Sequence, residues 1–530
     1  MPLGTRLRLG DHTGTVRYAG PVDGTAGEWL GVEWDDPARG KHDGVKDGKR
    51  YFSCTRIPNS ASFIRPTARD LSYGSSFLDA LKAKYVESFQ GPQETVVLGS
   101  SKGAIQVEAV DLDKIRAKFA DLGSLREVSL DTDYVSRYDG PPGSIQATCP
   151  NVRGLDLSMS LIPDWNTISA ICSELPWLQR LALNRTRLHP PEHLTPEPFA
   201  NLVELRLNAT LTTWREMQQI TSAMAQLKTV EVGHNRIAQL STVTSSVEGS
   251  ALKTVNLDSN ALNDWPSIVS ALLPYPRLYR VVLAANLLER IPPPPQSQQI
   301  LRIQHLSLSH NQLSSWDDID AVAAWCPNIQ TLSMTGNPLF GDPVRGRSAR
   351  PLVIARIPSL VALDAAAISL KERTDCELFY LSQIVLHEPD DHTRSAAHPR
   401  WAALCAKHGR PDEPGRRDLH HDTLSRRLLE LNVYHIPQAP APPTAAAERH
   451  PATTHFVLRA LPTMTLRALR LKLRKTIRNS KVAESAETPM RIWLKMGDNE
   501  DAYALLAEER DAQDLAWLGV ESGSSILCAV

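Results

Sequence analysis

The sequence has little of what marks a secreted, membrane-spanning or nucleic-acid-binding chain. No apolar run reaches about 18 residues, and the first residues, MPLGTRLRLGDHTG, lack the apolar core of a signal peptide. The seven cysteines are scattered without metal-ligand spacing. Lys and Arg number 58 against 59 Asp and Glu, for a net charge of −1. We therefore expect a reduced, cytoplasmic protein with no membrane and no nucleic-acid partner.

Common enzyme motifs are also missing. The chain contains no GxGxxG, GxxxxGK[ST] or HExxH segment. His420, His421 and Asp422 stand side by side, but neighbouring residues on a helix point to different faces, so they do not predict a metal site. We expect a non-enzymatic protein with no cofactor and no bound metal.

A motif of spaced apolar residues repeats along the middle of the chain. The motif is an apolar residue, any two residues, an apolar residue, any one residue, and a third apolar residue. Its copies begin 24 to 27 residues apart, at Leu125, Val152, Leu178, Leu202, Leu227, Leu252, Leu278, Ile303 and Ile329. This period is typical of leucine-rich repeats, and it predicts an α/β solenoid over residues 125–339 with one strand of a common parallel sheet in each repeat.

The residue eight places after each start is a further regular feature. In the later copies it is asparagine, namely Asn235, Asn260, Asn286, Asn311 and Asn337. A buried asparagine there can bond backbone groups of neighbouring turns that water does not reach. The earlier copies have Asp133, Ser160, Thr186 and Thr210 instead, so we expect a less regular N-terminal half.

Both ends of the solenoid are expected to carry helical caps. Residues 70–124 should contain a helix with Leu78, Leu81 and Tyr85 on one face, capped by Ser75 or Ser76, and a second helix over 112–122. Residues 340–436 should form a C-terminal cap and helical region. The expected cap residues are Leu360, Leu363, Leu370, Leu378 and Leu381, and Leu424, Leu428 and Leu431 mark one further helix. The Pro/Ala-rich segment 437–452 is predicted to be a linker.

Residues 453–530 are predicted to form a separate α+β unit. A strand over 454–459 is followed by a helix with Leu466, Leu469, Leu473 and Ile477 on one face, and by strands at 491–494 and 525–530. This order resembles the β-grasp fold of ubiquitin-like domains. Arg467, Arg470, Arg474 and Arg478 should form a solvated face of the helix. The last residues, LCAV, differ from the Gly-Gly tail of conjugated ubiquitin-like proteins, so we interpret the unit as a docking module.

Residues 1–69 are rich in glycine and in short β-type runs, which predicts a small all-β barrel. The motif Gly40-Lys41-His42-Asp43-Gly44 follows GEWLGV at 27–32 and precedes the pair Tyr51-Phe52. Together these segments resemble the CAP-Gly domain, with His42 where that family usually has asparagine. The resemblance implies binding of acidic C-terminal tails that end in an aromatic residue, as in α-tubulin.

The resemblance also implies which residues form the tail-binding site: Trp29, Val32, Gly40, Lys41, His42, Asp43, Gly44 and Phe52. Glycines let the backbone approach a ligand, and Lys41 offers a charge for tail carboxylates. Trp29 and Phe52 would form an apolar slot for the terminal ring. The imidazole of His42 can titrate near neutral pH, which makes the pH dependence of binding an open question.

The order of the three domain types in this multi-domain chain resembles the tubulin-folding cofactor E (tubulin-specific chaperone E) family. That resemblance implies a cytoskeleton-associated chaperone that handles α-tubulin with cofactors B, C and D, in assembly and in dissociation of the αβ-tubulin heterodimer. Two alternatives stay open at this point. One is a microtubule-associated scaffold that does not remodel dimers, and the other is a ubiquitin-pathway factor that uses the C-terminal domain.

Overall fold

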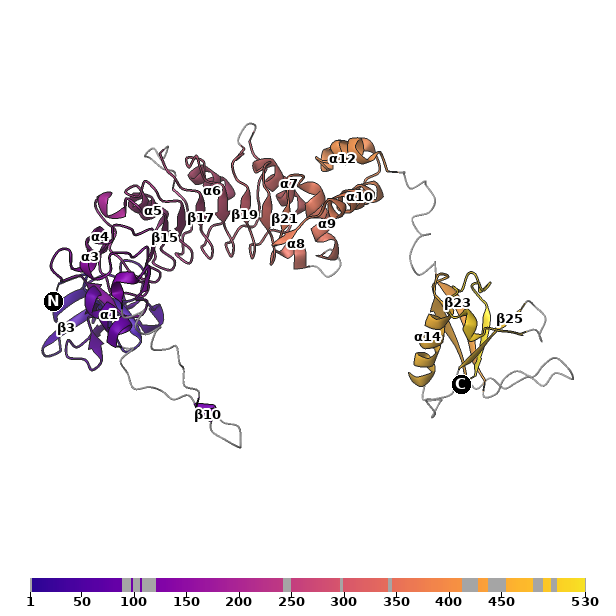
Figure 1. Ribbon diagram of the computed structural model, residues 1–530, viewed down its shortest axis with the longest axis horizontal. Helices are drawn as coiled ribbons and strands as arrows, with labels where there is room; N and C mark the ends of the chain where they lie inside the picture. The colour runs from indigo at the N-terminus through magenta and orange to yellow at the C-terminus, as the bar shows by residue number, and fades with distance from the viewer. Residues whose placement is uncertain are drawn as a thin grey trace. The chain divides into compact units, whose positions relative to one another are not determined.

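The computed structural model describes residues 2–87, 97–98, 105–106, 121–241, 249–295, 299–341, 346–411, 428–436, 454–479, 490–496 and 503–529. The chain divides into two compact units, Met1–Pro411 and Asp412–Val530, each with cores of its own (Figure 1). None of the described helices combines the length and the apolar character needed to cross a membrane. The predicted fold class, with an all-β N-terminal barrel followed by an α/β solenoid, is confirmed.

The N-terminal barrel is a strongly bent antiparallel sheet with a small hairpin beside it. The sheet has the strand order β6-β3-β2-β1-β7. Its core contains Leu7, Val16, Val32 and Trp34, each no more than 1% exposed. The strands are β1 (Arg6–Leu9), β2 (His12–Pro21), β3 (Glu28–Trp34), β6 (Ala61–Ile64) and β7 (Leu71–Ser72), and the hairpin is β4 (Val45–Lys46) with β5 (Lys49–Arg50).

The barrel leads without a break into the N-terminal cap of the solenoid. Strand β8 (Ser75–Ser76) pairs with β12 (Val135–Arg137), and α1 (Phe77–Lys82) follows. The Ser76 hydroxyl accepts from the backbone N–H of Asp79, which confirms the expected helix and its cap. Residues 112–120 of the second expected helix lie outside the described residues, and Leu122 begins a 3-10 turn, η4 (Leu122–Ser124). The other elements of this region are η2 (Ala83–Glu87), β9 (Val97–Leu98), β10 (Ile105–Gln106) and α3 (Ser144–Thr148).

The solenoid has one three-residue strand for each of the nine predicted repeats. Every strand begins two residues after the start of its repeat and pairs in parallel with the next, in the same register. The predicted repeat register is therefore confirmed. The strands are β11 (Glu127–Ser129), β13 (Gly154–Asp156), β14 (Arg180–Ala182), β15 (Glu204–Arg206), β16 (Thr229–Glu231), β17 (Thr254–Asn256), β18 (Arg280–Val282), β19 (His305–Ser307) and β20 (Thr331–Ser333).

Buried asparagines bond the turns of the later repeats to one another. The side-chain amide of Asn260 donates to the carbonyls of Val232 and Leu257 at 3.0 Å each. Its side-chain oxygen accepts from the backbone N–H groups of Asn235 and Ile237, also at 3.0 Å. One side chain therefore satisfies groups in two neighbouring repeats, where an unpaired group would be costly.

Three of the earlier repeats keep the same turn with the buried hydroxyl groups of Ser160, Thr186 and Thr210. Thr186 is fully buried, donates to the carbonyl of Leu157 and accepts from the backbone N–H of Ser160. In all nine repeats the residue before this position has a positive φ, from Thr132 to Gly336. The expectation of a less regular N-terminal half is thus wrong for the strands and turns, because a hydroxyl can replace part of the amide's bonding.

A second, longer period is superimposed on the repeats. Four helices start at tryptophans 49, 51 and 51 residues apart, and α5, α6 and α7 lie along one side of the row of strands in Figure 1. Each tryptophan follows an Asp, Thr or Ser whose side chain caps the helix. The helices are α4 (Trp165–Ser173), α5 (Trp214–Thr221), α6 (Trp265–Leu272) and α7 (Trp316–Trp325).

The third, fifth and seventh repeats cross the same side of the solenoid with little or no helix in their described residues. Prolines at 190, 191, 196 and 198, and at 292–295, explain this in two of them, because proline removes a helical donor and clashes with the preceding turn. Only η5 (Glu197–Phe199) forms in the first of these. The second is held by the next helix: Asp318 accepts from the N–H of Ile291, and the Trp325 indole donates to the carbonyl of Pro292. Two successive repeats therefore form one structural pair.

A C-terminal cap closes the solenoid, although it differs from the expected one. Leu360 directly follows a turn and Leu363 lies in a short strand that extends the sheet, so neither belongs to a helix as expected. Leu381 is buried, whereas Leu370 and Leu378 are exposed. The cap consists of α8 (Pro338–Gly341), α9 (Gly346–Arg356), β21 (Ala362–Leu363), β22 (Ala366–Ala367), α10 (Leu370–His387), α11 (Asp391–Ala397) and α12 (Trp401–His408).

The C-terminal unit is a five-stranded mixed sheet with one long helix, as the predicted β-grasp requires. The sheet order is β24-β23-β27-β25-β26, with β27 parallel to β23. The predicted apolar face of α14 is confirmed, since Leu466, Leu469, Leu473 and Ile477 are all buried. The elements are β23 (Leu429–His435), β24 (Thr454–Ala460), α14 (Leu466–Asn479), β25 (Arg491–Lys495), β26 (Tyr503–Leu505), η6 (Glu508–Arg510) and β27 (Ser525–Ala529).

Three expectations for this unit are wrong. Leu431 lies in strand β23 rather than in a helix, and β23 pairs with β24 along its whole length, so the predicted boundary at 453 separates two paired strands. The solvated arginine face is also interrupted. Arg470 is 8% exposed and bonds to Asp511 and to the Met490 carbonyl, whereas Arg467 and Arg474 are exposed. The predicted linker at 437–452 lies outside the described residues.

The asparagine bonds predict a large loss of stability on truncation. Asn260→Ala and Asn311→Ala should each lower the free energy of unfolding by roughly 1–3 kcal/mol, because buried backbone groups lose their partners. Asn263→Ala, at an exposed position of the same solenoid, should have little effect. Denaturant midpoints of the three variants measure this, and equal midpoints for Asn260→Ala and Asn263→Ala would contradict the role assigned to the buried amide.

Candidate functional site

The loop Gly40-Lys41-His42-Asp43-Gly44 is pinned to the edge strand of the barrel. The backbone N–H groups of Lys41 and His42 both donate to the carbonyl of Ala61, at 2.7 and 3.2 Å, and Ala61 N–H donates back to His42. Gly40 passes so close to β6 that a Cβ there would lie 2.4 Å from Ser60 Cα. At Gly44 the φ is +79°, and a Cβ would lie 2.1 Å from the Phe52 carbonyl oxygen. Both glycines are therefore required by the path of the loop.

Asp43 ties this loop to the segment that follows the hairpin. Its carboxylate accepts from the Arg50 guanidinium at 3.0 Å and from the Cys54 backbone N–H at 3.1 Å. These two bonds, the Arg50 one first, hold the pKa of Asp43 below its usual range. The structure thus gives Asp43 a role in shaping the loop.

Trp29, Lys41 and His42 line a common pocket of about 390 Å³. The Trp29 indole donates to the Thr25 hydroxyl at 2.7 Å, and the Arg65 guanidinium lies 3.8 Å from its ring, so this side chain is held in place. The full lining is Val22, Thr25, Trp29, Arg39, Lys41, His42, Lys46, Ser62, Phe63 and Ile64. This set includes three cations and no carboxylate.

Aromatic rings form the floor beside this pocket. The Phe63 ring centroid lies 5.0 Å from that of His42 and 5.6 Å from that of Phe52. Phe52 is only 8% exposed and packs over Gly31, where a Cβ would come within 2.2 Å of its ring. Phe52 therefore supports the pocket from below, and Phe63 supplies the accessible ring.

The predicted site residues are thus only partly brought together. Val32 is fully buried in the barrel core and does not line this pocket. Arg39, Lys46 and Phe63 line the pocket and were not predicted. Phe63 is half-buried between the buried residues Ser62 and Ile64 on β6, because neighbouring side chains of a strand point to opposite faces. No comparable pattern marks Arg39 and Lys46, because they flank the motif in a turn and in the small hairpin.

His42 accepts a hydrogen bond, as an asparagine side chain can. Its Nδ1 lies 3.0 Å from the backbone N of Gly44, which donates to it. This geometry requires an unprotonated Nδ1, and hence a neutral imidazole with its proton on Nε2. Partial burial lowers the pKa of His42 below 6.5, and the charge of Lys41 acts in the same direction, against the charge of Asp43. The neutral ring therefore prevails at neutral pH.

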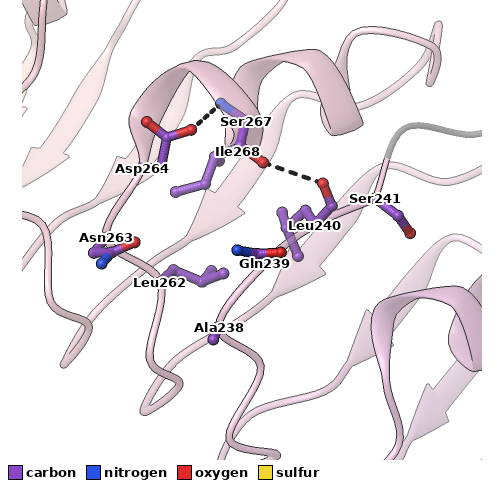
Figure 2. Close-up of a pocket in the computed structure, with 9 residues that line it drawn as sticks. All are labelled: Ala238, Gln239, Leu240, Ser241, Leu262, Asn263, Asp264, Ser267 and Ile268. Atoms are coloured by element: carbon purple, nitrogen blue, oxygen red, sulfur yellow. Dashed lines mark hydrogen bonds between the residues drawn. The ribbon is translucent and has the colours of Figure 1, made fainter.

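A second hollow, of about 470 Å³, lies on the helical side of the solenoid. Figure 2 shows that it faces the start of α6, where the Asp264 carboxylate caps the Ser267 N–H and the Ser267 hydroxyl bonds to the Leu240 carbonyl. Its one ionisable group is thus already used to cap the helix. Among the described residues no cluster of His, Cys, Asp or Glu could hold a metal ion, and His420, His421 and Asp422 lie outside them.

The fold and the pocket define a CAP-Gly protein with a leucine-rich-repeat solenoid, and comparison with known proteins agrees. The CAP-Gly domain model matches residues 3–69. The chain is 32% identical to tubulin-specific chaperone E of Bos taurus over 455 residues, which cover 81% of this chain and 84% of the relative. The chain belongs to the tubulin-specific chaperone E family.

More distant similarities fit this assignment. Tubulin-folding cofactor E of Arabidopsis thaliana is 29% identical over 76% of this chain and 77% of its own length. Among solved structures, the leucine-rich repeat domain of APL1B is similar at 15% identity, over 44% of this chain and 62% of that one, with a TM-score of 0.25. A score this low does not indicate a shared fold, so the solenoid assignment depends on the strand register.

The hydrogen bond to His42 predicts a pH dependence of the barrel. Because the folded state lowers the pKa of His42, the stability due to the neutral ring is fully present above about pH 6.5 and is lost as the pH falls below it. His42→Asn keeps an acceptor and removes the titration. The barrel's unfolding temperature should therefore decline more steeply between about pH 7 and pH 5 in the natural protein than in His42→Asn. Parallel slopes for the two proteins would show that His42 does not titrate in this way.

Proposed function

We propose that the protein is a non-enzymatic tubulin-folding chaperone. It binds α-tubulin through the acidic-aromatic C-terminal tail and through the solenoid, and assists assembly and dissociation of the αβ-tubulin heterodimer with cofactors B, C and D. The observation that carries this proposal is the cationic, aromatic-floored pocket at Lys41 in a chain of the chaperone E family. The same function places it in the cytoplasm, in association with the cytoskeleton.

The chemistry of the pocket matches that of an acidic tail with a terminal aromatic residue. Trp29 and Phe63 offer apolar faces to a ring, and a buried ring contributes through its apolar area. Lys41, Arg39 and Lys46 surround this floor, so carboxylates that precede the ring meet positive charge. Lys41 is exposed and free to reach a tail, whereas Asp43, the nearest carboxylate on the loop, is neutralised by Arg50.

The solenoid is proposed to bind the body of the same partner. Its strand residues alternate between the core and the concave face, and on this face many charges are already paired, such as Arg206 with Glu231 at 3.6 Å. Such a surface offers area rather than one dominant anchor. We assign the C-terminal unit a docking role toward a partner cofactor.

Tail binding is tested with a peptide that ends in Glu-Glu-Tyr and the full-length protein. Binding should be around micromolar, about −8 kcal/mol, and removal of the final Tyr should weaken it by roughly 2 kcal/mol through lost apolar burial. Lys41→Ala should weaken binding about fivefold, because one cation at the rim is lost. Lys49→Ala removes a cation that lies outside the pocket and pairs with Asp23, so it serves as the matched control. Titration calorimetry measures all four, and equal binding of the Tyr-less peptide would refute the site.

Chaperone activity is tested by incubating the protein with αβ-tubulin, with and without cofactor B. Loss of heterodimer on a native gel, stronger when cofactor B is present, is the expected result. Cosedimentation with microtubules while the dimer stays intact would instead indicate a scaffold. Transfer of ubiquitin in the same assay would indicate a ubiquitin-pathway factor.

A further inference from the structure

The barrel and the solenoid are joined by almost no free chain. Strand β7 of the barrel ends at Ser72, and strand β8, which pairs with the solenoid's β12, begins at Ser75. Between them, Gly74 has a φ of +73°, and a Cβ there would lie 2.1 Å from the Tyr134 carbonyl oxygen. The Arg137 guanidinium donates to the Gly74 carbonyl at 3.2 Å. This junction is packed and bonded, unlike a linker.

A second contact joins the barrel to the solenoid through two residues that are far apart in the sequence, Arg56 and Glu216. The Arg56 guanidinium donates to both carboxylate oxygens of Glu216, at 2.9 and 3.2 Å, and to the Leu211 carbonyl at 3.3 Å. Both side chains are largely shielded, with exposures of 27% for Arg56 and 17% for Glu216. Burial would raise the pKa of Glu216, but the hydrogen bonds from Arg56 and Thr213 and the charge of Arg56 together outweigh it, so the pKa lies below its usual range. A bidentate, shielded pair of this kind fixes orientation as well as distance.

Each partner of this pair is itself held rigidly. Glu216 closes the capping box of α5, where its carboxylate accepts from the Thr213 N–H at 2.8 Å. On the other side, the backbone N–H of Arg56 donates to the Glu33 carboxylate of β3 at 2.9 Å. A continuous series of hydrogen bonds therefore runs from the barrel sheet to a solenoid helix.

Two further contacts lie on the same edge of the solenoid. Arg187 is mostly buried, bonds to the Ala209 carbonyl, and lies 4.0 Å from Asp35 of the barrel. The Arg8 guanidinium lies 4.3 Å from the Tyr134 ring centroid. Tyr134, Arg187 and Leu211 all stand nine residues after the start of their repeats, so the barrel follows one edge of the sheet across repeats one to four.

We propose that Arg56 and Glu216 are positioning residues: they hold the tail pocket at a fixed angle to the concave face, so that tail and body of one partner molecule bind together. This inference rests on the proposed function. Because the barrel is held rigidly against the solenoid, the tail pocket lies at one distance from the concave face. When the tail and body of a partner match that distance, binding of one raises the effective concentration of the other, and no free energy is spent on ordering the barrel relative to the solenoid. Loss of the Arg56–Glu216 pair would let the barrel move relative to the solenoid and would remove that gain, although the pocket itself is unchanged.

The rigid junction between barrel and solenoid is tested first by a distance measurement on the full-length protein. Spin labels on Thr67→Cys in the barrel and Lys253→Cys in the solenoid, both at exposed positions, report the separation, with half-buried Cys54 and Cys405 replaced by serine. We expect a single narrow distance distribution in the otherwise natural protein and a broader one after Arg56→Met or Glu216→Gln. Glutamine also closes a capping box, so Glu216→Gln removes the charge and keeps the start of α5. A broad distribution before either substitution would overturn the proposal.

The functional role is tested by comparing two ligands. Arg56→Met and Glu216→Gln should bind the Glu-Glu-Tyr peptide as the natural protein does, but should bind αβ-tubulin about tenfold more weakly. Glu372→Gln is the matched control, because Glu372 also lies in the first turn of a helix and pairs with an arginine, Arg350 at 2.8 Å, within the C-terminal cap. It should leave both affinities unchanged.

The outcomes separate the two proposals. If the natural protein fails to bind the peptide, the proposed tail site is wrong. The distance distribution still decides whether the junction between barrel and solenoid is rigid. If the peptide binds and Arg56→Met and Glu216→Gln keep full affinity for αβ-tubulin, Arg56 and Glu216 have no positioning role. Equal weakening by Glu372→Gln would show a general loss of helix stability instead.

Discussion

Burial of backbone polar groups at the end of each strand is the constraint on which the solenoid depends. Each repeat turns away from the common sheet at a point that neighbouring repeats cover on both sides, so water cannot bond the exposed N–H and C=O groups. The Asn260 side chain pairs such groups through five hydrogen bonds, and the Thr186 side chain does so through fewer. Once these groups are paired, the strands keep one register, and the edge that carries Tyr134, Arg187 and Leu211 becomes regular enough to mount a second domain.

The tail pocket also depends on hydrogen bonds that pair the backbone groups of its loop. Its loop holds its shape because Ala61, Asp43 and His42 bond the backbone on three sides, and because glycine occupies the two positions where a side chain would collide. The charge at the rim is therefore displayed by a rigid frame. The bond from Gly44 to His42 shows why histidine is compatible with a position usually held by asparagine: either residue can supply an acceptor.

Much of this was visible in the sequence, and the failures have physical reasons. Strict apolar spacing located all nine repeats, because each repeat must bury the same three side chains. The helix expected near Leu431 was wrong: Leu429, Leu431 and Val433 alternate with polar residues, which is a strand pattern, but Leu424 and Leu428 suggested a helical period. The sequence did not show that Phe52 lies below Phe63, because the position of a residue in a motif does not reveal its depth. The burial of Arg470 depends on Asp511, far along the chain, and no local pattern shows such a pairing.

The tryptophan-led helices imply a history for the solenoid as well as a structure. Since a helical repeat and its extended neighbour interlock through contacts such as those of Asp318 and Trp325, the interchangeable module is the pair of about 50 residues. Gain or loss of one module keeps every interlock intact, whereas gain or loss of a single repeat sets two like segments side by side. Lengthening or shortening of this solenoid in evolution should therefore proceed in even steps, and so should any attempt to redesign its reach.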